Sequence, residues 1–334
     1  MDNAGYRKIF KDIVLGYSAV KFDQDTLYIK HLSAIDQVDI DQIQDQYFSD
    51  AINRGIETEK ESLERLIKEG SWSEKDDKEI VTQENFLDSL RQSKTQIVLK
   101  SQIDKQNKLI DSTISKINQL KEKKKSLIGL TAESYSEKRA NDYYVIKSFF
   151  HDSKLKSPVF PGEKDFGELY QDEVTKFVSV YNETFQMFEE LKIQEMILQD
   201  FYYIYFPFSD DTVGFFGNPV CHLTYNQLKL IVYTKIFKNI FEQNSHIPEK
   251  IKKDPKALLD YGSITEEAKS KMKDQLDMSK DGATLFGATN EDYEYAGLEK
   301  PQDSSRISLQ KAAEQKGGKL SMEDLMELSG YNKK

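Results

Sequence analysis

Cys221 and His222 are the residues whose types could most directly do chemistry, because a thiol beside an imidazole can serve as a nucleophile with its base. Cys221 is the only cysteine of the chain. Neighbours in sequence rarely point at one site, so we interpret the pair as loop residues just before the start of a helix. An enzyme with a site near Cys221 and His222 is kept as the lesser alternative.

No metal site is predicted. The other histidines are far apart and lack the spacing typical of zinc ligands: His31, His151 and His246. The residues from Asp277 to Gly282 match the opening of a calcium-binding EF-hand loop. The twelfth position of such a loop supplies a bidentate glutamate, and here that position is Ala288. A calcium site would therefore lack its strongest ligand.

Motifs that hold phosphates or activate a serine are missing as well. The stretch from Gly214 to Pro219 contains two glycines, but it has neither the Lys-Ser/Thr pair of a phosphate-binding loop nor a strand before it. No Gly-x-Ser-x-Gly sequence occurs in the chain. The sequence therefore predicts a protein that is not an enzyme and that needs no cofactor.

Aromatic residues give the most informative signal. Six of the eight residues from Phe201 to Phe208 are aromatic, and Phe215 and Phe216 follow closely. One narrow helix face cannot hide them all, so they either pack between several helices or partly face a partner protein, where large aromatics supply much of the binding energy. Core packing is the favoured interpretation. The candidate interaction residues are Tyr202, Tyr203, Tyr205, Phe206, Phe208, Phe215 and Phe216.

The elements that must position these residues are mainly α-helical. A β-hairpin is predicted near the N-terminus, with strands at 17–22 and 26–32 joined by the polar residues 23–25. An acidic amphipathic helix follows over about 36–52, and a capping box at Thr58 opens a short helix. A lone hairpin is marginal in water, so we expect it to pack on a helix or to join a partner's sheet.

A long helix is predicted from about Ser73 to Ile128, folded back at Gly129 onto a second helix over about 132–150. Isoleucines seven residues apart form a short, imperfect heptad within the long helix. They are also candidate interaction residues, namely Ile103, Ile110 and Ile117. A cellular coiled-coil adaptor that self-associates through them is the main alternative function.

The predicted organisation has five parts. They are a hairpin segment at 1–35, a helical hairpin or coiled-coil domain at 36–153, a Pro/Gly linker at 154–167, an aromatic-rich helical domain at 168–261, and an extended tail with short docking helices at 262–334. The fold class is mainly α.

Composition bounds the function further. The net charge is −10, which argues against a protein that neutralises nucleic-acid phosphates. Its tightest basic run, Lys121–Lys125, is interpreted as a solvated helix face. The single cysteine fits a reducing compartment, and we expect neither a signal peptide nor a membrane span. A cytoplasmic protein is therefore predicted, with no nucleic-acid and no membrane partner.

The hairpin stretches Gly16–Phe22 and Thr26–Leu32, followed by the acidic helix, resemble the start of tail-assembly chaperones and baseplate-hub assembly proteins of contractile-tailed bacteriophages. The closing stretch Gly317–Met326 is similar to the acidic, methionine-bearing ends of such proteins. The resemblance implies a non-enzymatic assembly factor or virion component. It would bind other tail or baseplate proteins, or itself, in the host cytoplasm or in the virion.

Overall fold

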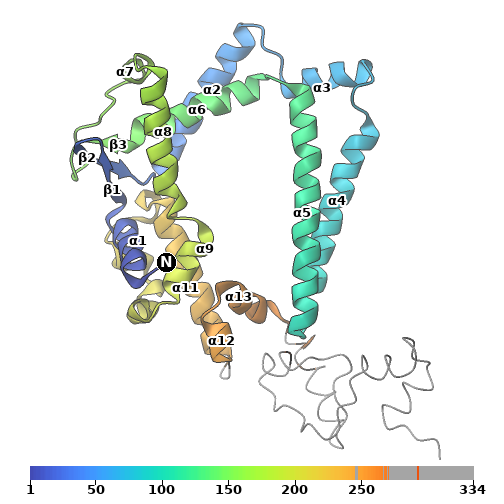
Figure 1. Cartoon of the computed structure of the whole chain (residues 1–334), viewed down its shortest axis with the longest axis vertical. Coiled ribbons are helices and arrows are strands. Elements are labelled where there is room, and N and C mark those ends of the chain that lie inside the picture. Colours follow the sequence, from blue (N-terminus) through green and yellow to red (C-terminus); the bar gives the residue numbers. More distant parts are fainter. Residues whose placement is uncertain (245–246, 266, 269, 271–291, 293–334) are drawn as a thin grey trace, which may run out of the picture. The chain divides into compact units, whose positions relative to one another are not determined.

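The structure is a computed structural model of the 334-residue chain, and it describes residues 1–244, 247–265, 267–268, 270 and 292. It is mainly α-helical with one small antiparallel sheet, as the sequence predicts (Figure 1). The chain groups into two compact units. The first contains Met1–Asn85, the described residues of 115–245, and Glu249–Leu259; the second contains Phe86–Ile114, Ile247, Pro248 and the described residues from Asp260 onward.

Strands β1 (Tyr17–Phe22) and β2 (Asp25–Lys30) form the predicted hairpin. The loop is one residue shorter than predicted, because Asp25 already pairs with Phe22. Asp23 adopts a positive φ of 54°, a conformation that aspartate tolerates better than most residues. The two-residue strand β3 (Phe149–Phe150) pairs with the other edge of β2, which gives the order β1-β2-β3.

The sheet packs on helices of its own chain. Its core joins buried residues of the hairpin, of β3, of α6 (Ala132–Ser148), of the segment before α7 (Glu163–Gly167), of α7 and of α8 (Gln171–Gln186), among them Leu27, Ile29, Ile146, Phe149, Phe160, Phe166 and Phe177. Phe160 and Phe166 lie in the stretch predicted as a linker. Pro161 and Gly162 form a bend there, but Pro158 pairs with Phe150 in an isolated β-bridge, and the aromatic residues anchor the stretch to the core.

Just after β2, His31 is buried between the rings of Phe185 and Phe188, with ring centroids 5.8 Å and 4.6 Å away. Its Nε2 lies 3.0 Å from the Ser18 hydroxyl on β1. Its Nδ1 has no hydrogen-bond partner among the described residues. Burial, helped by the charge of Lys8, lowers the pKa of His31 to about 3, so the ring is neutral inside the fold.

Helix α2 (Ala34–Asn53) opens with a capping box between Ser33 and Asp36 and packs against α6. Buried Ile40 and Ala140 lie at this contact, and the Tyr144 hydroxyl donates to Gln37 at 2.6 Å. The prediction that the helix at 132–150 packs against the long helix before it is wrong. Helix α6 pairs with α2 instead, because the short turn at Gly129 does not force its two flanking helices to pack side by side.

The predicted long helix is divided. Residues 95–99 separate α4 (Glu74–Lys94) from α5 (Lys100–Ile128). Before them, helix α3 (Glu59–Lys68) has the predicted Thr58 capping box. The antiparallel helical hairpin is therefore formed by α4 and α5. Three ion pairs within the first unit cross between them, Lys116–Glu79 at 3.0 Å, Lys121–Glu84 at 2.7 Å and Lys124–Asp77 at 3.0 Å.

Two lysines of the basic run 121–125 thus bind carboxylates rather than facing only water. Lys123 lies with its Nζ 5.8 Å from the centre of the Trp72 ring. Trp72 is buried with Leu66, Ile80 and Ile128. This apolar cluster joins the start of α4 to the end of α5.

After α8 the chain continues through α9 (Glu190–Ile197), the 3₁₀ helix η1 (Asp200–Asp210), α10 (Thr212–Phe216) and the short 3₁₀ turn η2 (Val220–His222). Helix α11 (Tyr225–Gln243) begins at the predicted Thr224 capping box, and α12 (Glu249–Lys252) and α13 (Pro255–Ser263) follow. The sequence predicts one helix from 169 to about 205 and a loop from 206 to 223. The structure has three helices in the first stretch and short helices in the second.

In the second unit, Asp260 joins α13 to residues of the helical hairpin. Its carboxylate accepts hydrogen bonds from Lys94 and, at 2.9 Å, from Asn107. Most of the predicted tail and its docking helices lies outside the described residues, as does the calcium-loop-like stretch from Asp277 to Ala288. No helix in the described part of the chain is long and apolar enough to cross a membrane.

Candidate protein-binding groove

The first wall of the candidate site is helix α1 (Asn3–Leu15). Asp2 caps its start by accepting the Gly5 N–H at 2.9 Å, and Gly16 ends it with a φ of 73°, which favours glycine. Tyr6, Ile9 and Ile13 bury one face of the helix. A neighbouring stripe at four-residue spacing stays accessible and consists of Phe10, Lys11, Val14 and Leu15.

Tyr6 fixes this wall to α9. Its hydroxyl donates to the Glu195 carboxylate at 2.8 Å. Burial, together with this hydrogen bond and the charge of Glu195, raises the pKa of Tyr6 to about 12, so the hydroxyl stays protonated and continues to donate.

The second wall is the aromatic segment, which runs as a 3₁₀ helix where the sequence predicts the end of a helix followed by a loop. Pro207 removes one backbone donor inside this stretch. Tyr202 and Phe206 are buried in the core, whereas Tyr205 and Phe208 remain accessible. The Tyr202 hydroxyl lies 2.8 Å from that of Thr234 on α11, and burial raises the pKa of Tyr202.

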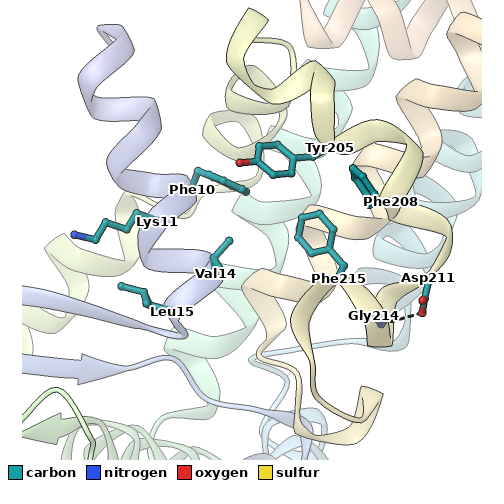
Figure 2. A pocket seen from close by; sticks show the side chains of 9 residues that line it. All are labelled: Phe10, Lys11, Val14, Leu15, Tyr205, Phe208, Asp211, Gly214 and Phe215. Atoms are coloured by element: carbon teal, nitrogen blue, oxygen red, sulfur yellow. Dashed lines mark hydrogen bonds between the residues drawn. The ribbon is translucent and has the colours of Figure 1, made fainter.

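Between the walls lies an open groove of about 660 Å³. Figure 2 shows Phe10 and Val14 extending from α1 toward Tyr205, Phe208 and Phe215. The Phe10 ring centroid lies 4.8 Å from Tyr205 and 5.4 Å from Tyr202, and the Tyr205 centroid lies 5.9 Å from Phe215. The aromatic rings thus support one another while their outer surfaces remain open.

A tight corner positions Phe215. The Asp211 carboxylate accepts the Gly214 N–H at 2.9 Å, which caps α10 (Figure 2). A Cβ at Gly214 would approach the Asp211 carboxylate far closer than van der Waals contact, so this position requires glycine while the cap is in place. Gly217 ends the helix with a φ of 70°.

Gln227 ties the end of α1 to the start of α11. Its side-chain oxygen accepts the Thr224 N–H at 2.9 Å, which completes the capping box. Its side-chain nitrogen donates to the Val14 carbonyl at 3.3 Å. One buried side chain therefore stabilises both the N-terminus of α11 and the last turn of the groove wall.

The aromatic candidates divide between core and surface. Tyr202 and Phe206 are buried, and Tyr203 stacks on Phe206 while keeping 41% of its surface exposed. Tyr205, Phe208 and Phe215 line the groove, and Phe216 lies half-buried with its ring centroid 4.7 Å from that of Phe215. No residue of α1 is among the sequence candidates. The available signal was its apolar stripe at three- and four-residue steps.

The heptad isoleucines lie inside the chain's own helical packing. Ile103, Ile110 and Ile117 are all buried in this single chain. In the second unit, Gln106 between them donates at 3.0 Å to the carbonyl of Leu90 on α4. These residues thus have an intramolecular role, and self-association through them stays a prediction.

Cys221 and His222 lie exposed on η2. Neither side chain makes a hydrogen bond to another described residue. Among the described residues, no group of three or more His, Cys, Asp or Glu side chains is placed to hold a metal ion.

Fold and groove together define a mainly α-helical protein with a small antiparallel sheet and an open aromatic groove. Searches against protein-family models, curated proteins and solved structures found no match to this chain.

Proposed function

We propose that this chain is a non-enzymatic factor that works by binding another protein at the groove between α1 and η1/α10. The observation that carries the proposal is the concentration of accessible apolar side chains on facing walls. Exposed fractions are 61% for Phe208, 45% for Leu15 and 40% for Val14. All three line the groove with the rings of Phe10, Tyr205 and Phe215.

Such a surface can supply useful binding energy. Fully burying a large apolar side chain contributes about 1.5–3 kcal/mol, and aromatic anchors in a pocket commonly dominate an interface. Ile204 of η1 and Val213 of α10 are also exposed, with exposed fractions of 66% and 49%. Scattered single apolar residues are normal on a surface, whereas a continuous group of this kind favours a protein contact.

The biological setting that we propose is tail or baseplate assembly in a contractile-tailed bacteriophage. The support is the resemblance of the hairpin and of the acidic helix after it, residues 16–53, to proteins of that class. In that setting the groove would hold an apolar segment of a tail component until that component is assembled.

The test is co-expression with the tape-measure and baseplate-hub proteins encoded in the same genome, followed by size-exclusion chromatography. The wild-type chain should form a complex and keep its partner soluble. Phe208→Asp should remove the complex, because the carboxylate would have to be buried in an apolar contact. Circular dichroism on the variant checks that it still folds.

Tyr170→Asp is the matched control. Tyr170 is an aromatic residue with an exposed fraction of 78%, and it does not line the groove. Its variant should bind as the wild type does. The proposal fails if no complex forms with any of these proteins, or if Phe208→Asp and Tyr170→Asp behave alike.

A further inference from the structure

On the α1 side of the groove lie two cations that have no carboxylate partner within the part of the chain that the structure describes. Lys8 is paired with Asp12 at 2.6 Å. Arg7 lies over the Phe201 ring at 5.6 Å, and Lys11 is at the outer edge of the groove (Figure 2). Neither Arg7 nor Lys11 forms an ion pair with any described residue. At a spacing of four residues they share one face of the helix, one turn apart.

The opposite wall carries two neighbouring carboxylates, of which only Asp210 is paired with a cation. Asp211 accepts the Gly214 N–H at 2.9 Å, and Asp210 is paired with Lys238 of α11. Asp211 keeps a negative charge on the opposite wall, because the Gly214 N–H is neutral, whereas the α1 edge carries positive charge that no described carboxylate pairs. An occupant that brings carboxylates to this edge would complement it.

The form of the groove indicates the shape of its occupant. Helix α1 has 13 residues and is therefore about 20 Å long at 1.5 Å per residue. Apolar side chains at four-residue steps on this wall face aromatic rings of the other wall. Proteins commonly use such grooves to bind the apolar face of an amphipathic helix.

We infer that the groove binds an acidic amphipathic α-helix of a partner protein. Its apolar side chains lie against Phe10, Phe208 and Phe215, and its carboxylates lie along the edge formed by Arg7 and Lys11. This inference rests on the proposed function and names the chemistry of the partner. A second copy of the chain fits less well, because two molecules with a net charge of −10 repel each other.

The probes are two fluorescently labelled synthetic peptides of about 15 residues, long enough for a helix of about 22 Å. Both have leucines at i, i+3, i+4 and i+7. The flanking positions are glutamates in one peptide and lysines in the other. Fluorescence anisotropy with the full chain measures the affinity of each.

The glutamate peptide should bind at least about 10-fold more tightly at low salt, because the lysine peptide replaces two attractions by two repulsions. The preference should shrink as salt is raised, since ionic screening shortens the range of these forces. The variant with Arg7→Gln and Lys11→Gln should lose most of the preference. Phe208→Asp should weaken the binding of both peptides.

Lys60→Gln with Lys138→Gln is the matched control. It removes the same charge from exposed lysines of α3 and α6, which do not line the groove, and it should leave the preference unchanged. Equal affinities, or tighter binding of the lysine peptide, overturn the inference about charge. Absence of binding by either peptide overturns the inference about a helical partner. The complex of the co-expression experiment judges the proposed function separately.

Discussion

Tyr202 and Phe208 lie six residues apart in the same aromatic segment, and they have opposite environments. Tyr202 is fully buried and bonded to Thr234, whereas Phe208 has an exposed fraction of 61%. Tyr202→Ala should therefore lower the free energy of unfolding by about 3–5 kcal/mol, as expected for a large buried ring. Phe208→Ala should change it by less than about 0.5 kcal/mol. Urea unfolding of both variants measures the difference.

Equal losses in the two variants would contradict this division between core and groove. Tyr202→Phe separates the stability contribution of the packed ring from that of the hydroxyl's hydrogen bond. It keeps the ring and removes one hydrogen bond, so it should cost about 1 kcal/mol. The Thr234 hydroxyl keeps its bond to the Leu230 carbonyl at 2.6 Å in that variant, which limits the penalty.

His31 should make the stability depend on pH below neutrality. Its pKa is about 3 in the folded chain, against about 6.5 in an unfolded one. Between these values the unfolded state binds the proton and the folded state does not, so protonation favours unfolding. The stability is fully present above pH 6.5 and falls by up to about 1.4 kcal/mol per pH unit below it.

His31→Gln gives the comparison, because glutamine does not titrate. Urea unfolding at about pH 7, 6 and 5 should show the wild type losing stability faster than the variant over this range. Parallel pH profiles would exclude His31 as the cause. Subtracting the two profiles also removes the contribution of carboxylates, which are the same in both proteins.

At the level of elements, Gln227 should stabilise two helices with one side chain. Gln227→Ala loses the capping bond to Thr224 and the bond to the Val14 carbonyl. The loss of a cap costs about 0.5–2 kcal/mol, and a buried unsatisfied group adds to that. We expect a total of about 2 kcal/mol in thermal or urea unfolding. Tyr225 lies two residues before Gln227 and is exposed, so Tyr225→Ala should lower the free energy of unfolding by clearly less.

Ile110→Asp tests what the heptad isoleucines do. Ile110 is buried in the chain itself, so the substitution places a carboxylate in an apolar contact and should lower the melting temperature strongly. An exposed residue of the same helix, Leu109→Asp, should be tolerated. Light scattering with chromatography shows whether either change alters the oligomeric state. A stable Ile110→Asp variant that only dissociates would instead support a coiled-coil adaptor.

Local signals in the sequence predicted several elements well. The hairpin, the acidic helix α2 and the capping boxes of α3 and α11 depend on neighbouring residues, so propensity and cap chemistry identify them. The break at 95–99 has no glycine or proline to mark it. The pairing of α2 with α6 depends on contacts about 100 residues apart, which local patterns do not specify.

The sequence candidates include the aromatic residues of one groove wall and no residue of the α1 wall. Six aromatics in eight residues stand out in composition, but the side of the segment that faces outward depends on its 3₁₀ twist and on the helices packed behind it. The α1 wall is distant in sequence, and its stripe also fits an ordinary amphipathic helix with a buried face. Only folding brings Phe10 to the rings of Tyr202 and Tyr205.

For the whole molecule, the net charge and the groove charge have opposite signs. The chain as a whole carries −10, which favours solubility and opposes association between copies. Arg7 and Lys11 pair with no carboxylate in the described part of the chain, and they attract a bound partner over a few ångströms, an attraction that weakens as salt is raised. General repulsion and local attraction together favour a specific partner over self-association.

Binding at the groove should therefore be visible as protection of particular amides. A ligand that binds only the folded state at about 100 times its Kd adds about 2.7 kcal/mol of stability. Some amides of α1 and η1 exchange only when the first unit unfolds. Their hydrogen exchange should slow by up to about 100-fold when the glutamate peptide is added. The peptide should cause no such slowing in Phe208→Asp. Protection that appears in the wild type but leaves α1 and η1 unchanged would place the contact on another surface.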